Sequence, residues 1–463
     1  MSLSKHIIFG TDKEVANCLE HKPKVNVIDE YGYSPLIQAA IVNSASKAKL
    51  LLDAGAEVDF NDVTTRTALH WAASNGNYEI CKLLIKQGAN ANSYTNAGQP
   101  VLVMPHLRRQ KNIQNLLIKH GAKLGFVQDF INAKLLGHSF ELEGRVDIID
   151  NTGTFIEVEL EGFYLEFNLE ILIKSLHDFK NNFAAKHFRD YFTKLDVIID
   201  ALHAAVELIK YQHYLVDIDK YAKRIDILLD QEPLILPISF DGHAITLIRF
   251  EDWLVRCDRG EFGRKNGTVN IYNIQNPHMF NKSFIRELLY KKQYSQFINS
   301  GLSRRLGLNT KLQLPLAPQK TGNCSWANVE AVVPTIMFLL FLQERGFNKI
   351  EDSQQEVLHF YNEWVEWDRN RELHFCLESF RETNAARKAA KAALLAAILF
   401  QSCQYNDSQD QQKVAKILPI LTSPDYSYIL KSYVEVFGKN QHNESMDNLH
   451  NFLDDFGINV QGL

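Results

Sequence analysis

One cysteine stands where a turn gives way to an expected helix, in TGNCSWANVEA at residues 321–331. A thiol attacks a carbonyl as its thiolate. It therefore needs a neighbouring base or cation, a group that orients the base, and a donor for the developing oxyanion. A helix N-terminus also lowers the pKa of a thiol. Cys324 is thus a candidate nucleophile, and the alternative interpretation is a small apolar residue of the core.

Two expected strands before Cys324 can supply the base and its orienting group. His243 opens the segment HAITLIRF after an Asp-Gly turn, and Asp258 ends the segment WLVRCD. If these segments pair across the short turn between them, His243 and Asp258 become cross-strand neighbours. The neighbouring Cys257 is interpreted as a buried strand residue. The orienting role stays open to three further residues, Glu251, Asp252 and Asn273.

A glutamine shortly before Cys324 can complete the site. Gln319 lies in APQKTGNCSW, so that its side-chain amide and the backbone N–H of Cys324 can converge on one oxygen. Gln313 is a second candidate for this oxyanion donor.

The elements that must position these residues follow from apolar patterning. Four short segments from residue 232 onward, EPLILPISF, HAITLIRF, WLVRCD and GTVNIYNI, predict an antiparallel meander. Residues 260–267, GEFGRKNG, are interpreted as a loop between strands. The segment from Phe140 to Phe167 predicts a strand pair around an Asn-Thr-Gly turn, followed by one or two helices through Ile225. The region after the meander is expected to be helical.

The first 124 residues are a repeat. Gly55, Gly88 and Gly121 close three segments at a spacing of 33 residues, each with a turn, a short helix and a second helix. This pattern resembles the ankyrin repeat. We count four units, of which the first offers only a second helix and the last has a short first helix. Residues at the turn tips are candidates for binding a partner protein, and the alternative is that they are solvated turn residues: Tyr31, Tyr33, Thr64 and Arg66.

Composition excludes several classes of protein. A net charge of -5 and a pI near 6.4 exclude a strongly basic nucleic-acid binder, so no direct DNA binding is expected. The six cysteines form no CxxC pair, which indicates a reducing compartment and predicts neither a zinc ribbon nor another metal or cofactor. The first residues lack the apolar core of a signal peptide, and the apolar stretch IMFLLFL is too short to span a bilayer, so no membrane insertion is expected.

The order His, Asp, Gln, Cys, with Trp326 soon after the cysteine, resembles the cysteine-protease clan that contains ubiquitin-like-protein proteases and YopJ-type bacterial effectors. The turn GNCSW is also similar to the nucleophile turn of papain, in which Cys precedes His along the chain, so that the order here is the permuted one. The resemblance covers roughly residues 234–345, and the Gln-to-Cys spacing is one residue shorter than usual in both families. It implies Cys324 as nucleophile, His243 as general base, Asp258 as orienter and Gln319 as oxyanion donor.

The whole chain resembles the ankyrin effectors that Legionella delivers into host cells by type IV secretion, with INAKLLGHSFELEG and CDRGEFGRKNGTVNIY as connecting motifs. We therefore expect a multidomain protein. The expected order along the chain is an all-α ankyrin solenoid (1–124), connecting strands and helices (125–230), an α+β cysteine-protease-like core with a small antiparallel sheet (231–345) and a helical C-terminal region (346–463). The resemblance implies a secreted effector that acts in the host cytosol or nucleus, binds a host protein through its repeats and attacks a protein carbonyl. The alternative is a binding protein whose protease-like domain is a scaffold without chemistry.

Overall fold

A computed structural model describes residues 2–30, 32–150, 152–212, 218–320, 322–437 and 444–458. The chain folds into two compact units. The first comprises Met1–Leu124, Phe163–Gln319 and Cys324–Trp364, and the second comprises Gly125–Gly162, Lys320–Asn323 and Val365–Leu463.

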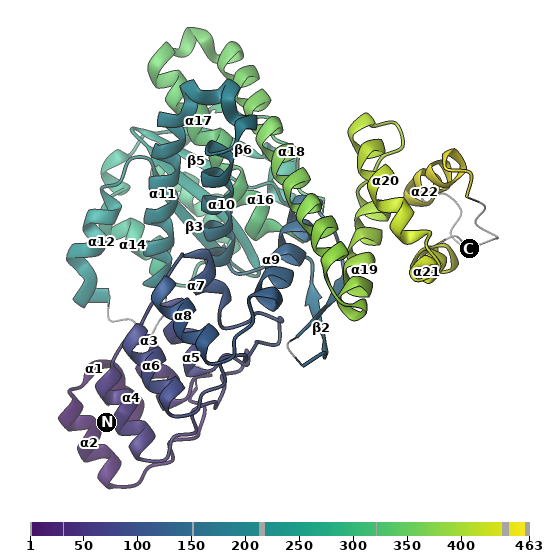
Figure 1. The fold of residues 1–463 in the computed structure, drawn as a ribbon. Helices are drawn as coiled ribbons and strands as arrows, with labels where there is room; N and C mark the ends of the chain where they lie inside the picture. The colour runs from purple at the N-terminus through teal and green to yellow at the C-terminus, as the bar shows by residue number, and fades with distance from the viewer. Residues whose placement is uncertain are drawn as a thin grey trace. The chain divides into compact units, whose positions relative to one another are not determined.

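Helix pairs build the N-terminal repeats (Figure 1). Ser34 caps the helix that begins at Pro35, accepting a hydrogen bond from the Ile37 N–H at 3.4 Å. Gly55, Gly88 and Gly121 all have positive φ and close the second helices as expected. The pairs are α1 Leu3–Phe9 with α2 Asp12–Glu20, α3 Pro35–Ile41 with α4 Ala45–Asp53, α5 Ala68–Ser74 with α6 Tyr78–Lys86, and α7 Val103–Leu107 with α8 Lys111–Lys119.

The four helix pairs agree with the four repeats expected, with one correction. The first repeat has both helices, whereas the sequence indicated only the second. The short α1 carries one fully buried residue, Ile7, and therefore gives almost no periodic signal. The expected short first helix of the last unit is α7. Small apolar residues such as Ala39 and Ala72 are fully buried, which lets neighbouring repeats pack closely.

A five-stranded antiparallel meander forms the centre of the first unit, with strand order β3-β4-β5-β6-β7. Four strands confirm the prediction. The fifth was missed because its sequence, LNTKLQ, is largely exposed at the sheet edge and lacks apolar alternation. The strands are β3 Leu234–Phe240, β4 His243–Phe250, β5 Trp253–Cys257, β6 Val269–Ile274 and β7 Leu308–Gln313.

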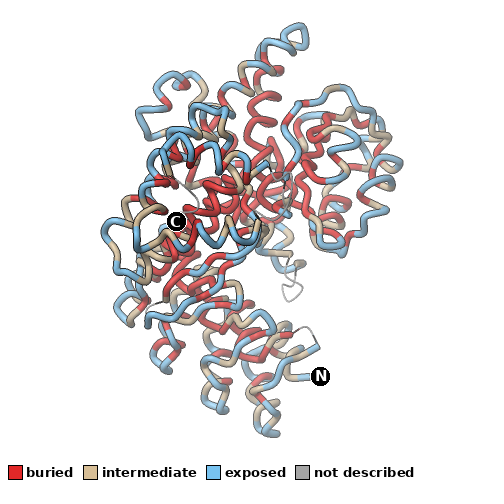
Figure 2. Tube along the Cα trace, turned by 90° about the vertical axis from the view of Figure 1, so that its right-hand side faces the viewer, coloured by how far each residue is buried: buried red, intermediate tan, exposed pale blue. Residues whose placement is uncertain are grey.

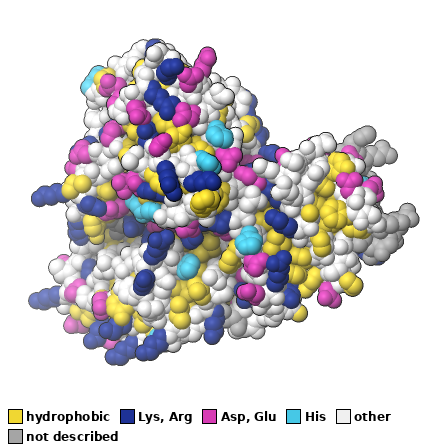
Figure 3. Space-filling model, turned by 45° about the horizontal axis from the view of Figure 1, so that its top comes forward, with side chains coloured by type: hydrophobic (Ala, Val, Ile, Leu, Met, Phe, Trp, Pro, Cys, Tyr) yellow, Lys and Arg dark blue, Asp and Glu magenta, His cyan; other side chains and the backbone are white. Residues whose placement is uncertain are grey.

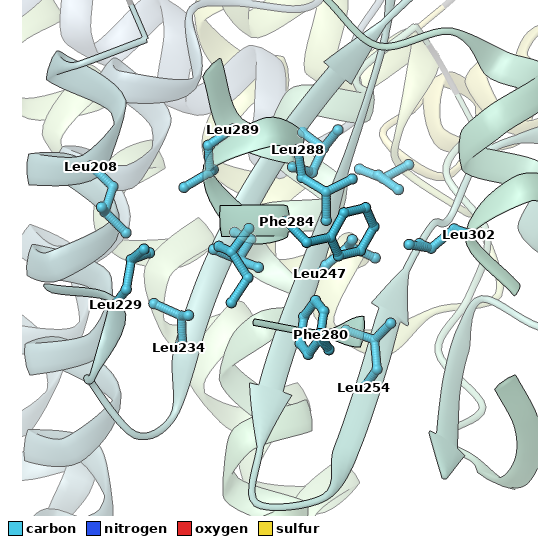
Figure 4. Packing of buried hydrophobic residues seen from close by; sticks show 14 of the residues in the cluster. Leu208, Leu229, Leu234, Leu247, Leu254, Phe280, Phe284, Leu288, Leu289 and Leu302 are labelled. Carbon is cyan, nitrogen blue, oxygen red and sulfur yellow. The ribbon is translucent and has the colours of Figure 1, made fainter. Parts of the chain in front are cut away.

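Apolar helices cover this sheet. Leu247 and Leu254 point into a cluster with Leu208 of α11 (Phe192–Lys210) and Phe284 of α14 (Lys282–Tyr290), as Figure 4 shows. The alternate residues of β4 and β5 point the other way, where the Cys257 sulfur lies 3.7 Å from the Thr335 hydroxyl. The further elements here are α10 Leu165–Lys180, η1 Phe183–Tyr191, η2 Ile218–Tyr221, α12 Ala222–Leu229, α13 Glu261–Asn266, η3 Pro277–Met279, the π-helix η4 Phe297–Gly301, α15 Leu302–Leu306, α16 Cys324–Glu330, α17 Val332–Arg345 and η5 Phe347–Lys349.

Two expectations about helix boundaries need correction. Residues 260–267 contain the six-residue helix α13 instead of a loop, since Gly263 lets the helix approach the Asp258 backbone too closely for any side chain. The predicted strand pair ends before Phe167, because α10 already begins at Leu165.

The second unit contains a strand pair and helices. Ile148 pairs with Ile156 across the predicted turn, in strands β1 Arg145–Ile149 and β2 Phe155–Glu159. The helices are α9 Leu124–Ser139, the end of the long α18 Ile350–Glu382, α19 Ala385–Gln401, α20 Ser408–Leu421, α21 Ser427–Phe437 and α22 Glu444–Asp455.

Buried positions follow the interiors of these elements, while exposed positions gather at loops and outer helix faces (Figure 2). Within the described ranges, one stretch, Cys324–Arg345, is long and apolar enough to cross a membrane. Its most apolar window is 94% buried inside the protein, which is typical of a core helix.

Candidate active site

Three elements bring the predicted residues together in the first unit. His243 is the first residue of β4, Asp258 directly follows β5, and Cys324 is the first residue of α16. Phe250 pairs with Trp253 at the turn, and Thr246 with Cys257 at the far end of the ladder. The side chains of His243 and Asp258 meet beyond that last pair, with 3.1 Å between His243 Nε2 and Asp258 Oδ1. The two side chains are therefore in contact, but the residues are not cross-strand partners as predicted, because the ladder ends before it reaches them.

A glycine makes this contact possible. If the β4–β5 pairing continued past Thr246 and Cys257, residue 260 would face His243. A Cβ atom at Gly260 would lie 2.9 Å from His243 Cε1, which is closer than side chains tolerate. The Gly260 N–H also donates to Asp258 Oδ1 at 3.2 Å. The absence of a side chain at residue 260 thus leaves room for the imidazole beside the carboxylate.

Asp258 is a buried carboxylate with several donors. Arg256 Nη2 donates to Asp258 Oδ2 at 2.6 Å, and both side chains are almost inaccessible to solvent. Burial raises the pKa of Asp258, but the hydrogen bonds from His243 and Arg256 outweigh it, so the pKa lies below its ordinary value. Arg256 in turn contacts the π-helix η4 through Asn299 and the Ile298 carbonyl. Asp258 is consequently held as an anion beside the imidazole.

The imidazole and the thiol form a coupled pair. Hydrogen bonds to Asp258 and to Cys324 raise the pKa of His243 to about 9. Burial raises the pKa of Cys324. The His243 hydrogen bond and the backbone N–H groups of Ala244 and Ser325 lower it by more than burial raises it, so the pKa lies below its ordinary value. Both shifts act in the direction of a thiolate beside an imidazolium.

Other cysteines do not share this environment. All six are free thiols, and burial raises the pKa to about 12 at each of four fully enclosed positions: Cys81, Cys257, Cys376 and Cys403. The interpretation of Cys257 as a buried strand residue agrees with its zero exposure. Cys324 is half-buried and has a lowered pKa, so it stands apart from the four buried thiols.

Gln319 is attached to the same neighbourhood through its backbone. Its N–H donates to the Arg259 carbonyl at 2.9 Å, directly after Asp258 in the chain, and its own carbonyl accepts from Arg264 at 2.6 Å. The second candidate, Gln313, donates its side-chain amide to the Asn266 carbonyl and to Asn270. The side-chain amide of Gln313 is therefore already used in these two hydrogen bonds at the end of β7.

The alternatives to Asp258 lie elsewhere on the sheet. Glu251 and Asp252 form the turn between β4 and β5, at the opposite end from His243, and Asn273 pairs with Trp253 near that same turn. Arg256 was missed by the sequence reasoning. Its signal was a basic residue inside the otherwise apolar strand WLVRC, which requires a buried partner for its charge.

The predicted partner-binding residues lie at the turns before the first helices of two repeats. Tyr31 lies outside the described residues. Thr64 is exposed and donates its hydroxyl to Asp62 at 2.7 Å. Tyr33 is partly buried, with its ring edge against Trp71 at 5.7 Å between centroids. The Arg66 guanidinium lies over both Trp71, at 5.0 Å, and Tyr164, at 4.3 Å.

The Arg66 contact joins the repeats to the helix of the candidate nucleophile. Tyr164 immediately precedes α10, and its neighbour Phe163 donates its N–H to the Ser325 hydroxyl at 3.1 Å. Asn168 donates to the same hydroxyl at 3.0 Å. The start of α10 thus touches both a repeat turn and the residue after Cys324.

Charges on the surface are mixed. On the face in Figure 3, Lys and Arg side chains are interspersed with Asp and Glu. Among the described residues on this face, the basic side chains form no continuous stripe of the kind that a nucleic-acid interface presents.

The fold and site define an ankyrin-repeat protein whose repeats adjoin an antiparallel sheet with a Cys-His-Asp cluster. A family model described as ankyrin repeats (3 copies) matches residues 4–95 and 36–126. Inversin of Gallus gallus is 35% identical over 94 residues, which are 20% of this chain and 8% of inversin. Human ankyrin repeat and KH domain-containing protein 1 is 37% identical over 83 residues, 18% of this chain and 3% of that protein. The chain therefore spans a small part of these relatives, within their repeats, which typically mediate protein–protein binding.

A solved structure of the Legionella effector AnkH matches over the whole length. It is 41% identical, with a TM-score of 0.91, and the match covers 99% of this chain and 98% of the other. The chain belongs to the family of this effector.

Proposed function

We propose that this chain is an effector that acts in the cytoplasm of a host cell, holds a host protein on its ankyrin repeats and attacks a carbonyl of a protein substrate with Cys324. In this scheme His243 is the general base, Asp258 orients it and Gln319 donates to the oxyanion. The observation that carries the proposal is the His243 ring, which lies 3.1 Å from the buried Asp258 carboxylate and lowers the pKa of the Cys324 thiol while its own pKa is raised. A thiolate–imidazolium pair needs an imidazolium that donates one N–H to a carboxylate and the other to the thiolate.

The chemistry follows from these positions. The thiolate forms a bond to the carbonyl carbon, and the leaving group takes the proton from the His243 imidazolium. Water, deprotonated by the same imidazole, then releases the acyl group and restores the thiol. Peptide or isopeptide cleavage follows when the leaving group is an amine, and deamidation or acyl transfer uses the same thioester with a different leaving group or acceptor.

The contact between the repeats and α10 supports recruitment. Arg66 is stacked on Tyr164, while Phe163 and Asn168 bind Ser325 beside the nucleophile. A protein bound at the repeat turns would thus be held by elements that pack directly against the helix of Cys324. Such an arrangement raises the effective concentration of its acyl groups.

An activated ester tests the chemistry without knowledge of the substrate. Cys18 is also only partly buried, so the experiment uses the Cys18→Ser background. With p-nitrophenyl acetate we expect a burst of nitrophenolate close to one equivalent, together with a thioester on Cys324 visible in the intact mass. Cys324→Ala should remove the burst, and Gln319→Ala should slow it. A wild-type protein that shows no burst above the Cys324→Ala rate contradicts the proposal.

The second candidate function is a binding protein in which the sheet and its cluster are a scaffold. The observation that favours it is the match of the repeats to the ankyrin family model, because such repeats typically mediate protein–protein binding. In this case capture of a host protein survives Cys324→Ala and is lost in Arg66→Ala. Survival of capture together with an absent ester burst would select the scaffold.

A further inference from the structure

The cluster leaves unexplained how three separate elements keep their catalytic side chains aligned. β4 brings His243, the end of β5 brings Asp258, and α16 brings Cys324. β4 and β5 are joined by their backbone ladder, but its last pair, Thr246 and Cys257, lies before His243 and Asp258. The geometry of the site therefore also needs a contact that holds α16 against these two strand ends.

One buried amide provides such a contact. Asn328 lies one helical turn after Cys324 on α16, and its side chain is 1% exposed. Its Nδ2 donates to the Ala244 carbonyl at 2.7 Å, and its Oδ1 accepts from the Arg259 N–H at 2.6 Å. Ala244 follows His243 and Arg259 follows Asp258 in the chain. The Asn328 amide thus bonds the residues next to the base and next to its orienter.

The hydrogen bonds of Asn328 connect further to Gln319, the candidate oxyanion donor. The carbonyl of Arg259 accepts from the Gln319 N–H, so the two backbone groups of residue 259 connect Asn328 to the Gln319 loop. The Arg259 side chain reinforces this point, since its Nε donates to the Ala317 carbonyl at 2.7 Å and its Nη1 to Glu330 of α16 at 2.9 Å. All four predicted site residues consequently adjoin one hydrogen-bond network.

We propose that Asn328 is a positioning residue that keeps the nucleophile, the base and its orienting carboxylate in register through its buried amide. This inference rests on the proposed function. Only an amide of this length offers a donor and an acceptor to the two backbone groups at once. An aspartate would place a carboxylate oxygen against the Ala244 carbonyl, and a serine would be too short to reach both partners.

The test measures the rate of Cys324 alkylation by iodoacetamide against pH, in the Cys18→Ser background. We expect Asn328→Asp to raise the midpoint of the pH profile by one unit or more, because the thiolate separates from His243. Asn328→Ser, which introduces no buried charge, should move it in the same direction. Acylation by p-nitrophenyl acetate should fall at least tenfold in both variants.

Asn270→Asp is the matched control. Asn270 is equally buried at 2% exposure, donates to the Gly267 carbonyl at 2.6 Å and accepts from Gln313 at 2.8 Å, but it touches none of the site residues. Its replacement should lower thermal stability and leave the alkylation midpoint unchanged.

The outcomes distinguish a positioning role of Asn328 from a purely structural one. Wild-type midpoints in both Asn328 variants overturn the positioning role and leave the proposed function intact. If both variants fail to fold while Asn270→Asp folds, Asn328 is a residue of general stability and the proposal is rejected. An ordinary, undepressed midpoint in the wild-type protein refutes the proposed function itself.

Discussion

Replacement of His243 by alanine should separate a catalytic thiolate from an ordinary thiol. In the folded protein two opposing influences act on the pKa of Cys324: burial raises it, and the His243 hydrogen bond with the nearby N–H groups lowers it more. His243→Ala removes the largest lowering contribution and leaves the burial. The pKa of Cys324 should therefore rise.

The size of the effect can be worked out. At a pH below both pKa values, each pKa unit by which the thiol rises lowers the thiolate fraction about tenfold. The thiolate that remains is the better nucleophile, because nucleophilicity rises by roughly 0.4–0.5 log units per pKa unit. The alkylation rate in this range should thus fall about threefold for each pKa unit. At high pH, where both thiols are ionised, the variant should react faster than the wild type.

The assay follows iodoacetamide labelling by intact mass between pH 5 and 11, in the Cys18→Ser background. The four enclosed cysteines, whose pKa values burial raises to about 12, should remain unlabelled in the folded protein. If His243 lowers the pKa of Cys324, the rate profiles of wild type and His243→Ala must cross. Profiles that coincide over the whole pH range would show that His243 does not act on Cys324.

Three further predictions concern the surroundings of the pair. Gly260→Ala should abolish the lowered midpoint of Cys324 alkylation, because the new Cβ meets His243 Cε1. The backbone at residue 260, with φ -81, accepts alanine. A midpoint like that of the wild type would contradict this prediction. Arg256→Met should lower the free energy of unfolding by about 3–5 kcal/mol, because it leaves the buried Asp258 charge without its partner. Arg224→Met, at an exposed ion pair, should lower it by at most about 1 kcal/mol. Equal losses in chemical denaturation would argue against a buried pair. The raised pKa of His243 contributes stability that is fully present below about pH 6.5 and lost as the pH rises through about 9. The melting temperatures of wild type and His243→Ala should accordingly converge between these values, and a constant gap would contradict it.

Local patterns sufficed for much of the fold. The spacing of Gly55, Gly88 and Gly121 predicted the repeats because a left-handed residue must close each second helix. The apolar segments predicted β3 to β6 because buried strands require such residues. The edge strand β7 and the helix α1 escaped prediction, since an exposed edge and a short capping helix bury too little to constrain their sequence.

The candidate site shows where sequence reasoning ended. The residue types of Cys324, His243 and Asp258, and the turn that pairs β4 with β5, were sufficient to propose the cluster. The choice of Asp258 over Glu251, Asp252 and Asn273 needed the strand register, because all four side chains are polar and near a strand end.

The sequence by itself determined the repeats, the meander and the chemical types of the candidate site, because those depend on neighbours along the chain. Only the tertiary structure decided that His243 reaches both Asp258 and Cys324, that Gly260 leaves room for the ring and that Asn328 joins their elements. These contacts join residues between 15 and 84 positions apart, and no local preference encodes a hydrogen bond across such a distance.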